Sequence, residues 1–266
     1  MNRIDIQEDD IRTIATKVKN NRVYRQQRRN GETIHGFLQY LEEKGFYQVP
    51  RFLGIDEKNR EILSYVPGTT FTEYPPLPVL GSEKQVICEI AALLRKYHDA
   101  TLDYEIKKED IWVLPYKGNL VKEVICHNDF APYNVTFSGK HPVGIIDFDS
   151  ATPGPRIWDI AYAMYRFIPL GREIFEPEKQ EYRNYDPLRD ADFRKEGIAL
   201  FFQAYGMERP EDFFEQVTMR IEYLIDTMEE GIQAGNEAFI RMKEEGHIAF
   251  YQEEIKFIQK NALNWI

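Results

Sequence analysis

The chain has 266 residues, of which 43% are hydrophobic, and a formal net charge of −10. This length suffices for two modest lobes or one large domain, and the apolar content supplies a core and excludes extensive disorder. The acidic balance argues against nucleic acid as the main partner, because phosphate backbones need basic surfaces, but it is compatible with cationic small molecules.

Cysteine usage and the apolar runs indicate the compartment. The two cysteines, Cys88 and Cys126, lie far apart and form no CxxC motif, which favours a reducing environment without disulfides or a zinc site. The first residues, MNRIDIQEDD, are too acidic for a secretory signal, and no apolar run reaches membrane-spanning length. We therefore expect a cytoplasmic protein with no membrane partner.

The first elements in chain order are two strands and one helix. The alternating segment NRVYRQ (21–26) and the segment EILSYV (61–66) predict strands, the second closed by a Pro-Gly pair. Between them, residues 31–44 place apolar side chains on one helical face and end before a glycine. Residues 69–81 are proline-rich and aperiodic, so we predict a loop there and place the lobe boundary beside it.

Helices dominate the rest of the chain. A Ser82-x-x-Gln85 capping box predicts the start of a helix that runs to residue 100. Residues 122–126 predict a strand, and NVTF and VGIIDFD predict a hairpin around the turn at 138–141. The remaining predicted helices are a buried one at 157–168 and amphipathic ones at 189–205, 210–233 and 247–265.

One short segment, ICHNDFAPYNVTF (125–137), combines ionisable and amide residues with apolar flanks. It spells H-x-D-x-x-x-x-N with His127, Asp129 and Asn134, and Asp147 follows at the end of the apolar stretch GIID. The catalytic loop of protein kinases has this spacing. Phosphoryl transfer from ATP needs oxygen ligands for magnesium and a carboxylate near the attacking hydroxyl, and these residues supply both.

The stretch from Ile125 to Phe167 resembles the aminoglycoside phosphotransferase and choline kinase family, small-molecule kinases with a protein-kinase-like fold. The likeness extends back through FLQYLEEKGFYQVPRFLGIDEKNREILSYVPG and LLRKYHDAT, and so covers most of residues 23–168. No long activation segment follows Asp147, because the chain runs directly into WDIAYA. This favours a small-molecule kinase over a protein kinase.

The resemblance implies a role for each matching residue. Asp129 is the expected catalytic base or hydroxyl-positioning carboxylate, and His127 is the loop histidine that orients it. Asn134 and Asp147 are the expected magnesium ligands. Asp159, in WDIA, corresponds to an aspartate that hydrogen-bonds the loop.

Three further positions follow from the same resemblance. The backbone of Ser64 and Val66, in LSYV, is expected to bind the adenine edge. Asp149 is left open between a metal or substrate contact and a surface or capping carboxylate.

The front of the chain departs from the family pattern. No lysine occupies the third-strand position that grips phosphates, and residues 9–21 contain no glycine for a loop over the phosphates. Arg25 is the candidate for the phosphate contact, with Lys17, Lys19 and Arg28 as alternatives, and Glu32 is its candidate acidic partner.

We therefore expect an α+β, protein-kinase-like, two-lobed fold, with a reduced N-terminal lobe (1–66) and a large, mainly helical C-terminal lobe (67–266). The expected function is ATP- and Mg²⁺-dependent phosphorylation of a hydroxyl on a small, cationic molecule such as an aminoglycoside or amino alcohol. Asp226 and Glu229, on a predicted helix, could bind its ammonium groups, or could form a solvated helix face. The alternatives are a catalytically weak binding protein and a kinase of an uncharged sugar or nucleoside-like compound. The sequence predicts neither the substrate nor the oligomeric state.

Overall fold

The computed structural model of the chain describes residues 17–71, 84–168, 170–176, 179 and 181–266. The predicted capping box at Ser82 and most of the predicted loop at 69–81 lie outside these residues. The lobe boundary between residues 66 and 67 stays a prediction.

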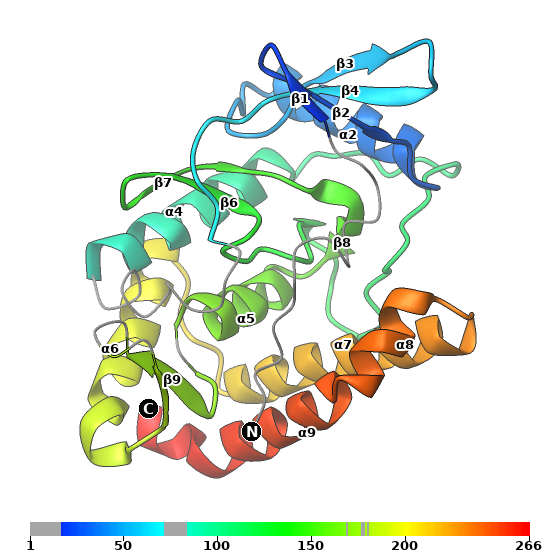
Figure 1. Cartoon of the computed structure of the whole chain (residues 1–266). Coiled ribbons are helices and arrows are strands. Elements are labelled where there is room, and N and C mark those ends of the chain that lie inside the picture. The colour runs from blue at the N-terminus through cyan, green and yellow to red at the C-terminus, as the bar shows by residue number, and fades with distance from the viewer. Residues whose placement is uncertain (1–16, 72–83, 169, 177–178, 180) are drawn as a thin grey trace.

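A four-stranded antiparallel sheet and one helix form the upper part of the molecule (Figure 1). Its strand order is β1-β2-β4-β3, with β1 at Lys17–Lys19, β2 at Arg22–Gln26, β3 at Phe52–Ile55 and β4 at Arg60–Ser64. The β1–β2 hairpin turns through Asn20 and Asn21, whose φ angles of 53° and 56° suit a tight two-residue connection. Strands β1 and β3 are not among the predicted elements; β1 is exposed along its whole length, so it has no apolar pattern to indicate it.

Helix α2 (Gly31–Glu43) confirms the predicted front helix. Its apolar stripe of Ile34, Phe37 and Leu38 is buried, which is what a 3.6-residue period on one face requires. Gly45 follows the helix with φ 76°, a left-handed conformation that glycine adopts at low cost and that ends the helix.

The lower part is mainly helical, as predicted. The structure adds α8, the β8 strand and the β9–β10 hairpin, none of which shows a sequence period long enough to predict. The helices are α4 (Lys84–Ala100), α5 (Arg156–Phe167), α6 (Pro187–Tyr205), α7 (Phe213–Gln233), α8 (Glu237–Glu244) and α9 (His247–Asn261), and the strands are β5 (Val124–Cys126), β6 (Val135–Ser138), β7 (His141–Ile145), β8 (Thr152–Gly154), β9 (Glu173–Glu176) and β10 (Glu181–Asn184).

Two small antiparallel pairs, β5–β8 and β6–β7, lie between the upper sheet and the helices (Figure 1). Beneath them α5 is almost wholly buried, α7 packs against α5 and α9, and α4 packs against α6. The four phenylalanines 201, 202, 213 and 214 belong to this core. Both β pairs therefore rest on the helices, and the chain just after β7 contacts the upper sheet through Arg25.

A long connecting segment, residues 101–123, joins α4 to β5, and three of its hydrogen bonds link it to distant parts of the fold. The Ile111 amide donates to Thr33 Oγ1 of α2 at 2.8 Å. The Leu114 carbonyl accepts from Asn128 Nδ2 at 3.3 Å, and the Pro115 carbonyl accepts from the Tyr223 hydroxyl of α7 at 3.1 Å. The segment thus contacts the front helix, the loop after β5 and α7.

Among the described helices, none is both long and apolar enough to span a bilayer.

Candidate active site

The loop between β5 and β6 carries the H-x-D-x-x-x-x-N residues, and Asp159 of α5 holds its backbone. Asp159 is fully buried and accepts hydrogen bonds from the His127 amide at 2.6 Å and the Asn128 amide at 2.7 Å. His98 of α4 bonds the same carboxylate at 3.1 Å. Burial alone would raise the pKa of Asp159, but His98 and the amides lower it below its ordinary value. The resemblance implied this loop-holding role, and the structure shows the hydrogen bonds.

Asp129 lies at the turn of this loop with both carboxylate oxygens engaged. The Tyr133 hydroxyl donates to Oδ1 at 2.7 Å, and Asn134 Nδ2 donates to Oδ2 at 2.8 Å. Burial raises the pKa of Asp129, while the Tyr133 hydrogen bond opposes the rise. The carboxylate is therefore held in one orientation, which is what a group that positions a substrate hydroxyl requires.

His127 links this loop to the strand end that carries Asp147. Its Nδ1 accepts from the Asp129 amide at 3.3 Å, so the neutral ring bears its proton on Nε2, which donates to the Ile146 carbonyl at 2.9 Å. The ring is fully buried. These contacts suit a residue that positions Asp129 relative to Asp147.

Asn134 and Asp147 offer oxygens of the kind that magnesium prefers. Asn134 Nδ2 bonds the Asp129 backbone carbonyl as well as its carboxylate, so the amide oxygen Oδ1 is the atom left for a cation. Asp147 has φ 65°, and its side chain is 45% exposed. The Ile146 amide donates to the Asn134 carbonyl at 2.8 Å, which joins the two loops directly. Two hard oxygens on adjoining loops fit a Mg²⁺ ion that takes its remaining ligands from phosphates and water.

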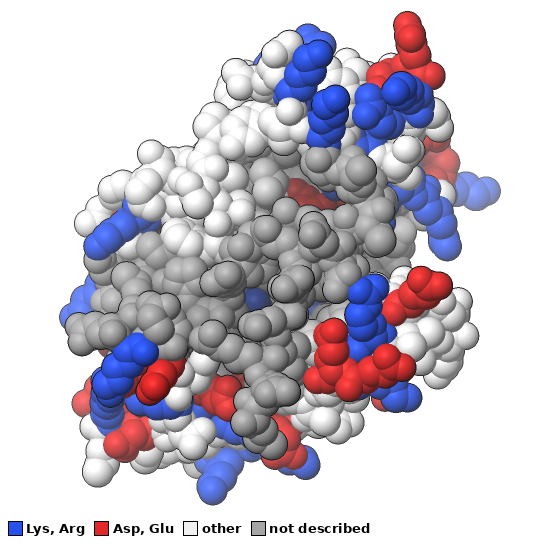
Figure 2. All heavy atoms as spheres, viewed as in Figure 1, with Lys and Arg blue, Asp and Glu red and all other residues white. Residues whose placement is uncertain are grey.

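Arg25 reaches this site from β2. Its NH1 donates to Asp147 Oδ1 at 3.1 Å, and its NH2 donates to Asp149 Oδ1 at 2.6 Å. Arg28 Nε bonds Asp149 Oδ2 at 3.0 Å. Burial alone would lower the pKa of Arg25, but the surrounding carboxylates raise it, so the guanidinium stays charged. Lys17 and Lys19, the alternatives on β1, are exposed, and Figure 2 shows basic side chains over this sheet.

The acidic partner of Arg25 is Glu61 of β4, and the expectation of Glu32 was wrong. Arg25 and Glu61 are directly opposite in the β2–β4 register, and Arg25 Nε lies 2.5 Å from Glu61 Oε1. Glu61 Oε2 bonds His35 Nε2 of α2 at 2.6 Å. Glu32 is on the exposed side of that helix. The helix thus contributes a histidine, and the strand contributes the carboxylate.

The segment after β4 contains the expected adenine contacts. The Ser64 amide donates to the Arg51 carbonyl at 2.9 Å, so only the Ser64 carbonyl could serve a ligand. In the described part of the chain the Val66 amide has no backbone partner. Gly68 has φ 128°, and a Cβ there would lie 2.9 Å from the Phe137 carbonyl oxygen, so only glycine fits.

The predicted acidic pair lies on α7, apart from the loop residues. Asp226 and Glu229 are exposed, and no described contact joins either to Asp129. Their neighbour Glu230 pairs with Lys117 of the connecting segment at 2.5 Å. The structure therefore leaves both carboxylates at the surface beside the connecting segment and does not bring them to the catalytic loop.

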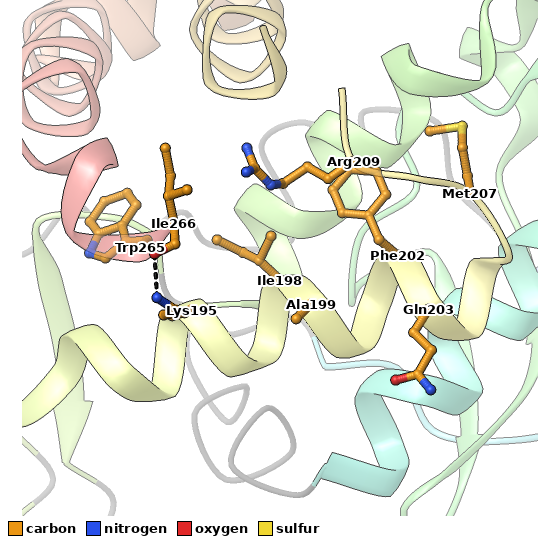
Figure 3. A pocket seen from close by; sticks show the side chains of 9 residues that line it. All are labelled: Lys195, Ile198, Ala199, Phe202, Gln203, Met207, Arg209, Trp265 and Ile266. Carbon is orange, nitrogen blue, oxygen red and sulfur yellow. Dashed lines mark hydrogen bonds between the residues drawn. The ribbon is translucent and has the colours of Figure 1, made fainter. Parts of the chain in front are cut away.

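Two other features of the described residues resemble sites. A cavity of about 330 Å³ lies beside α6, where Lys195 bonds the Ile266 carbonyl (Figure 3). It shares no residue with the loops above and is lined mainly by apolar side chains such as Phe202. The buried set of His98, Cys126 and Asp159 has the residue types of a metal site. However, Asp159 is already bonded to His98 and two amides, so this set is structural.

Comparison with known proteins defines the class. A family model described as the phosphotransferase enzyme family matches residues 112–191, which contain Asp129, Asn134 and Asp147. The resemblance seen in the sequence is thereby confirmed, and the fold is the α+β, protein-kinase-like fold. The fold and the matched segment together support a small-molecule phosphotransferase.

One protein is similar in sequence, and two solved structures are similar in fold. The trifolitoxin immunity protein of Rhizobium leguminosarum bv. trifolii is 27% identical over 191 residues, covering 70% of this chain and 68% of that protein. The structure of the GDP complex of aminoglycoside 2'-phosphotransferase-IIIa is similar with a TM-score of 0.59 and 12% identity, covering 91% of this chain and 89% of that one. Choline kinase from Cryptosporidium parvum Iowa II gives a TM-score of 0.54 at 10% identity, with 97% and 92% covered.

Sequence reasoning missed three residues of the site. Glu61 alternates in phase with the buried Leu63, so a glutamate on the inner face of a strand was the available signal. Tyr133 lies inside the motif itself, yet nothing in its spacing shows that its hydroxyl reaches Asp129. Arg220 is buried on α7 and donates to the Asn128 carbonyl at 2.5 Å, and its position among apolar residues was the signal.

Proposed function

We propose that this protein transfers the γ-phosphoryl group of ATP to a hydroxyl of a small, cationic molecule. The observation that carries the proposal is the convergence of Asp129, Asn134 and Asp147 on adjoining loops, with the Arg25 guanidinium brought to them from β2. A carboxylate, two hard oxygen ligands and a phosphate-binding cation are the parts that phosphoryl transfer requires.

Each residue has a task in this proposal. Asp129 orients the acceptor hydroxyl and takes its proton late in the transfer, and Tyr133 and Asn134 fix its carboxylate. Asn134 Oδ1 and Asp147 would hold Mg²⁺, which when bound neutralises charge on the phosphates. Arg25 contacts the phosphates, and the backbone at Val66 binds the adenine edge.

The acceptor is the least constrained part of the proposal. Asp226 and Glu229 are exposed, Asp226 lies near enough to Lys117 to interact with it electrostatically, and exposed carboxylates of this kind pair with ammonium groups. Similarity to an immunity protein supports a toxic or antibiotic-like acceptor, and similarity to aminoglycoside phosphotransferase and choline kinase folds supports a hydroxyl-bearing one. Aminoglycosides meet both conditions, and amino alcohols meet the second.

The test is a substrate panel scored by ADP release in the presence of ATP and Mg²⁺. It contains aminoglycosides, choline and homoserine, with neutral sugars and nucleosides as the comparison set. Release above the ATP-only rate with a cationic alcohol, confirmed by a mass increase of the acceptor, supports the proposal. Release only with sugars or nucleosides would replace the cationic acceptor with the uncharged class.

A binding protein with little catalytic activity is the second candidate. The observation in its favour is that the candidate residues are already satisfied by one another, since Tyr133 bonds Asp129 and Arg25 bonds Asp147. Equilibrium binding of panel members, with no ADP release from any of them, would favour this candidate over the enzyme.

A further inference from the structure

The Arg25 guanidinium uses different nitrogens for different carboxylates. Nε bonds Glu61 at 2.5 Å, NH1 bonds Asp147 at 3.1 Å and Asp149 at 3.2 Å, and NH2 bonds Asp149 at 2.6 Å. A guanidinium is a rigid planar fork with five N–H donors, so these contacts are fixed relative to one another. One arginine therefore connects the front sheet to both aspartates of the hairpin end.

The Glu61 end of this arrangement is the permanent one. Glu61 is 2% exposed, and its second oxygen is held by His35 of α2 at 2.6 Å. Burial alone would raise the pKa of Glu61, but His35 and Arg25 lower it, so the carboxylate stays charged. A buried carboxylate bonded on both oxygens does not release its partner readily, because the loss leaves an unpaired charge.

The aspartate end is the exchangeable one. The Asp147 side chain is 45% exposed and shares a single 3.1 Å bond with Arg25. Asp149 has both oxygens occupied, by Arg25 and by Arg28, and is 20% exposed. Asp149 is therefore an anchor for the two arginines in this state, whereas Asp147 is the carboxylate that solvent and ligands can reach.

We propose that Arg25 is an exchangeable cation that holds the metal-ligand carboxylate Asp147 until nucleotide phosphates take the guanidinium. Nε stays on Glu61 and NH2 stays on Asp149, while NH1 exchanges the Asp147 carboxylate for a phosphate oxygen. A divalent cation then binds together with nucleotide and not before it, because a guanidinium at hydrogen-bond range of Asp147 repels a second cation there. The inference rests on the proposed function only for the nucleotide that supplies the competing anion.

The test measures metal binding to the nucleotide-free protein, so it needs no acceptor and no turnover. Mn²⁺ is titrated into wild type, Arg25→Gln and Arg28→Gln, and free Mn²⁺ is followed by electron paramagnetic resonance. Arg28→Gln is the matched control, because Arg28 bonds Asp149 without contacting Asp147. We expect weak binding by wild type and Arg28→Gln, and affinity at least about tenfold higher in Arg25→Gln, since a unit charge next to the ligand is removed.

Two outcomes overturn the inference. One is saturable Mn²⁺ binding by nucleotide-free wild type as tight as that of Arg25→Gln, and the other is an equal gain in Arg28→Gln. Arg25→Lys is measured in parallel, with thermal melting of each variant, in case the glutamine variant does not fold. A lysine is a point charge that cannot hold Glu61 and both aspartates together, so its Mn²⁺ affinity should lie between the other two. ADP binding by wild type is measured separately, so that failure of the proposed function is recognised by itself.

Discussion

Removal of the Asp159 carboxylate should destabilise the whole fold and not only the catalytic loop. Asp159 is fully buried and bonds two backbone amides and His98. In Asp159→Ala, both amides and the imidazole lose their acceptor in a site that water does not reach. Each buried hydrogen-bonding group that is left without a partner costs about 1–3 kcal/mol, so for these three groups we expect a loss of unfolding free energy of at least about 3 kcal/mol.

The assay is urea unfolding followed by far-ultraviolet circular dichroism, with Asp159→Asn as the second variant. Asparagine keeps one acceptor oxygen but turns an amino group toward the second amide, so its loss should be smaller, about 1–3 kcal/mol. The control is Asp192→Asn on the exposed face of α6, which should change stability by less than about 0.5 kcal/mol. A loss below about 1 kcal/mol in Asp159→Ala would refute the reasoning.

The same carboxylate predicts a pH dependence. The pKa of Asp159 is lower in the folded protein than its ordinary value, so the ionised carboxylate stabilises the fold. This contribution is complete above the unfolded pKa of about 3.9 and is lost as the pH falls through the lower folded value. The stability difference between wild type and Asp159→Asn should therefore shrink under acid conditions, and a difference that widens there would contradict the assignment.

The remaining predictions concern the catalytic loop, the link between the lobes and the acceptor. Asp129→Asn should retain ADP binding and lower kcat about a hundredfold or more in the ADP-release assay; transfer at the wild-type rate would exclude the role of Asp129 as base. Tyr133→Phe, which removes one hydrogen bond to that carboxylate, should lower kcat about three- to tenfold with KM little changed, and an unchanged kcat would make the hydroxyl dispensable. Gly68→Ala should cost about 1–3 kcal/mol in urea unfolding, because its Cβ meets backbone at a positive φ; a neutral result would show that the segment can shift. If the acceptor is cationic, Asp226→Asn combined with Glu229→Gln should raise KM, and KM should also rise with salt concentration. A KM that changes with neither the substitutions nor the salt would favour an uncharged acceptor.

The sequence predicts best those elements in which a periodic pattern of apolar residues continues over many positions. Helices α2 and α7 are read directly from apolar spacing, because one face of each helix is buried and the other is exposed. Strands β9 and β10 pair only with each other, and each has four residues. Their formation depends on the tertiary context, which no local pattern contains.

The residues of the candidate site also differ in how well the sequence predicts that they come together. Asp129 and Asn134 are close in the chain, so their spacing alone indicates that one loop can hold both. Arg25 and Asp147 are 122 residues apart, and the contact between them depends on how the sheet and the hairpin meet. The choice of Glu61 over Glu32 likewise follows from tertiary structure: strand register places Glu61 opposite Arg25, whereas Glu32 is on the exposed side of helix α2.

The connecting segment has a mechanical consequence. Within five residues, Ile111 to Pro115, it is bonded to helix α2, to the catalytic loop and to helix α7. Any rotation of the front sheet and its helix away from the helical base must lengthen at least one of these three bonds. The segment therefore acts as a tether in parallel with the covalent link at residues 64–68. Substitutions along it can adjust how far the two parts separate while every chemical group of the site stays unchanged.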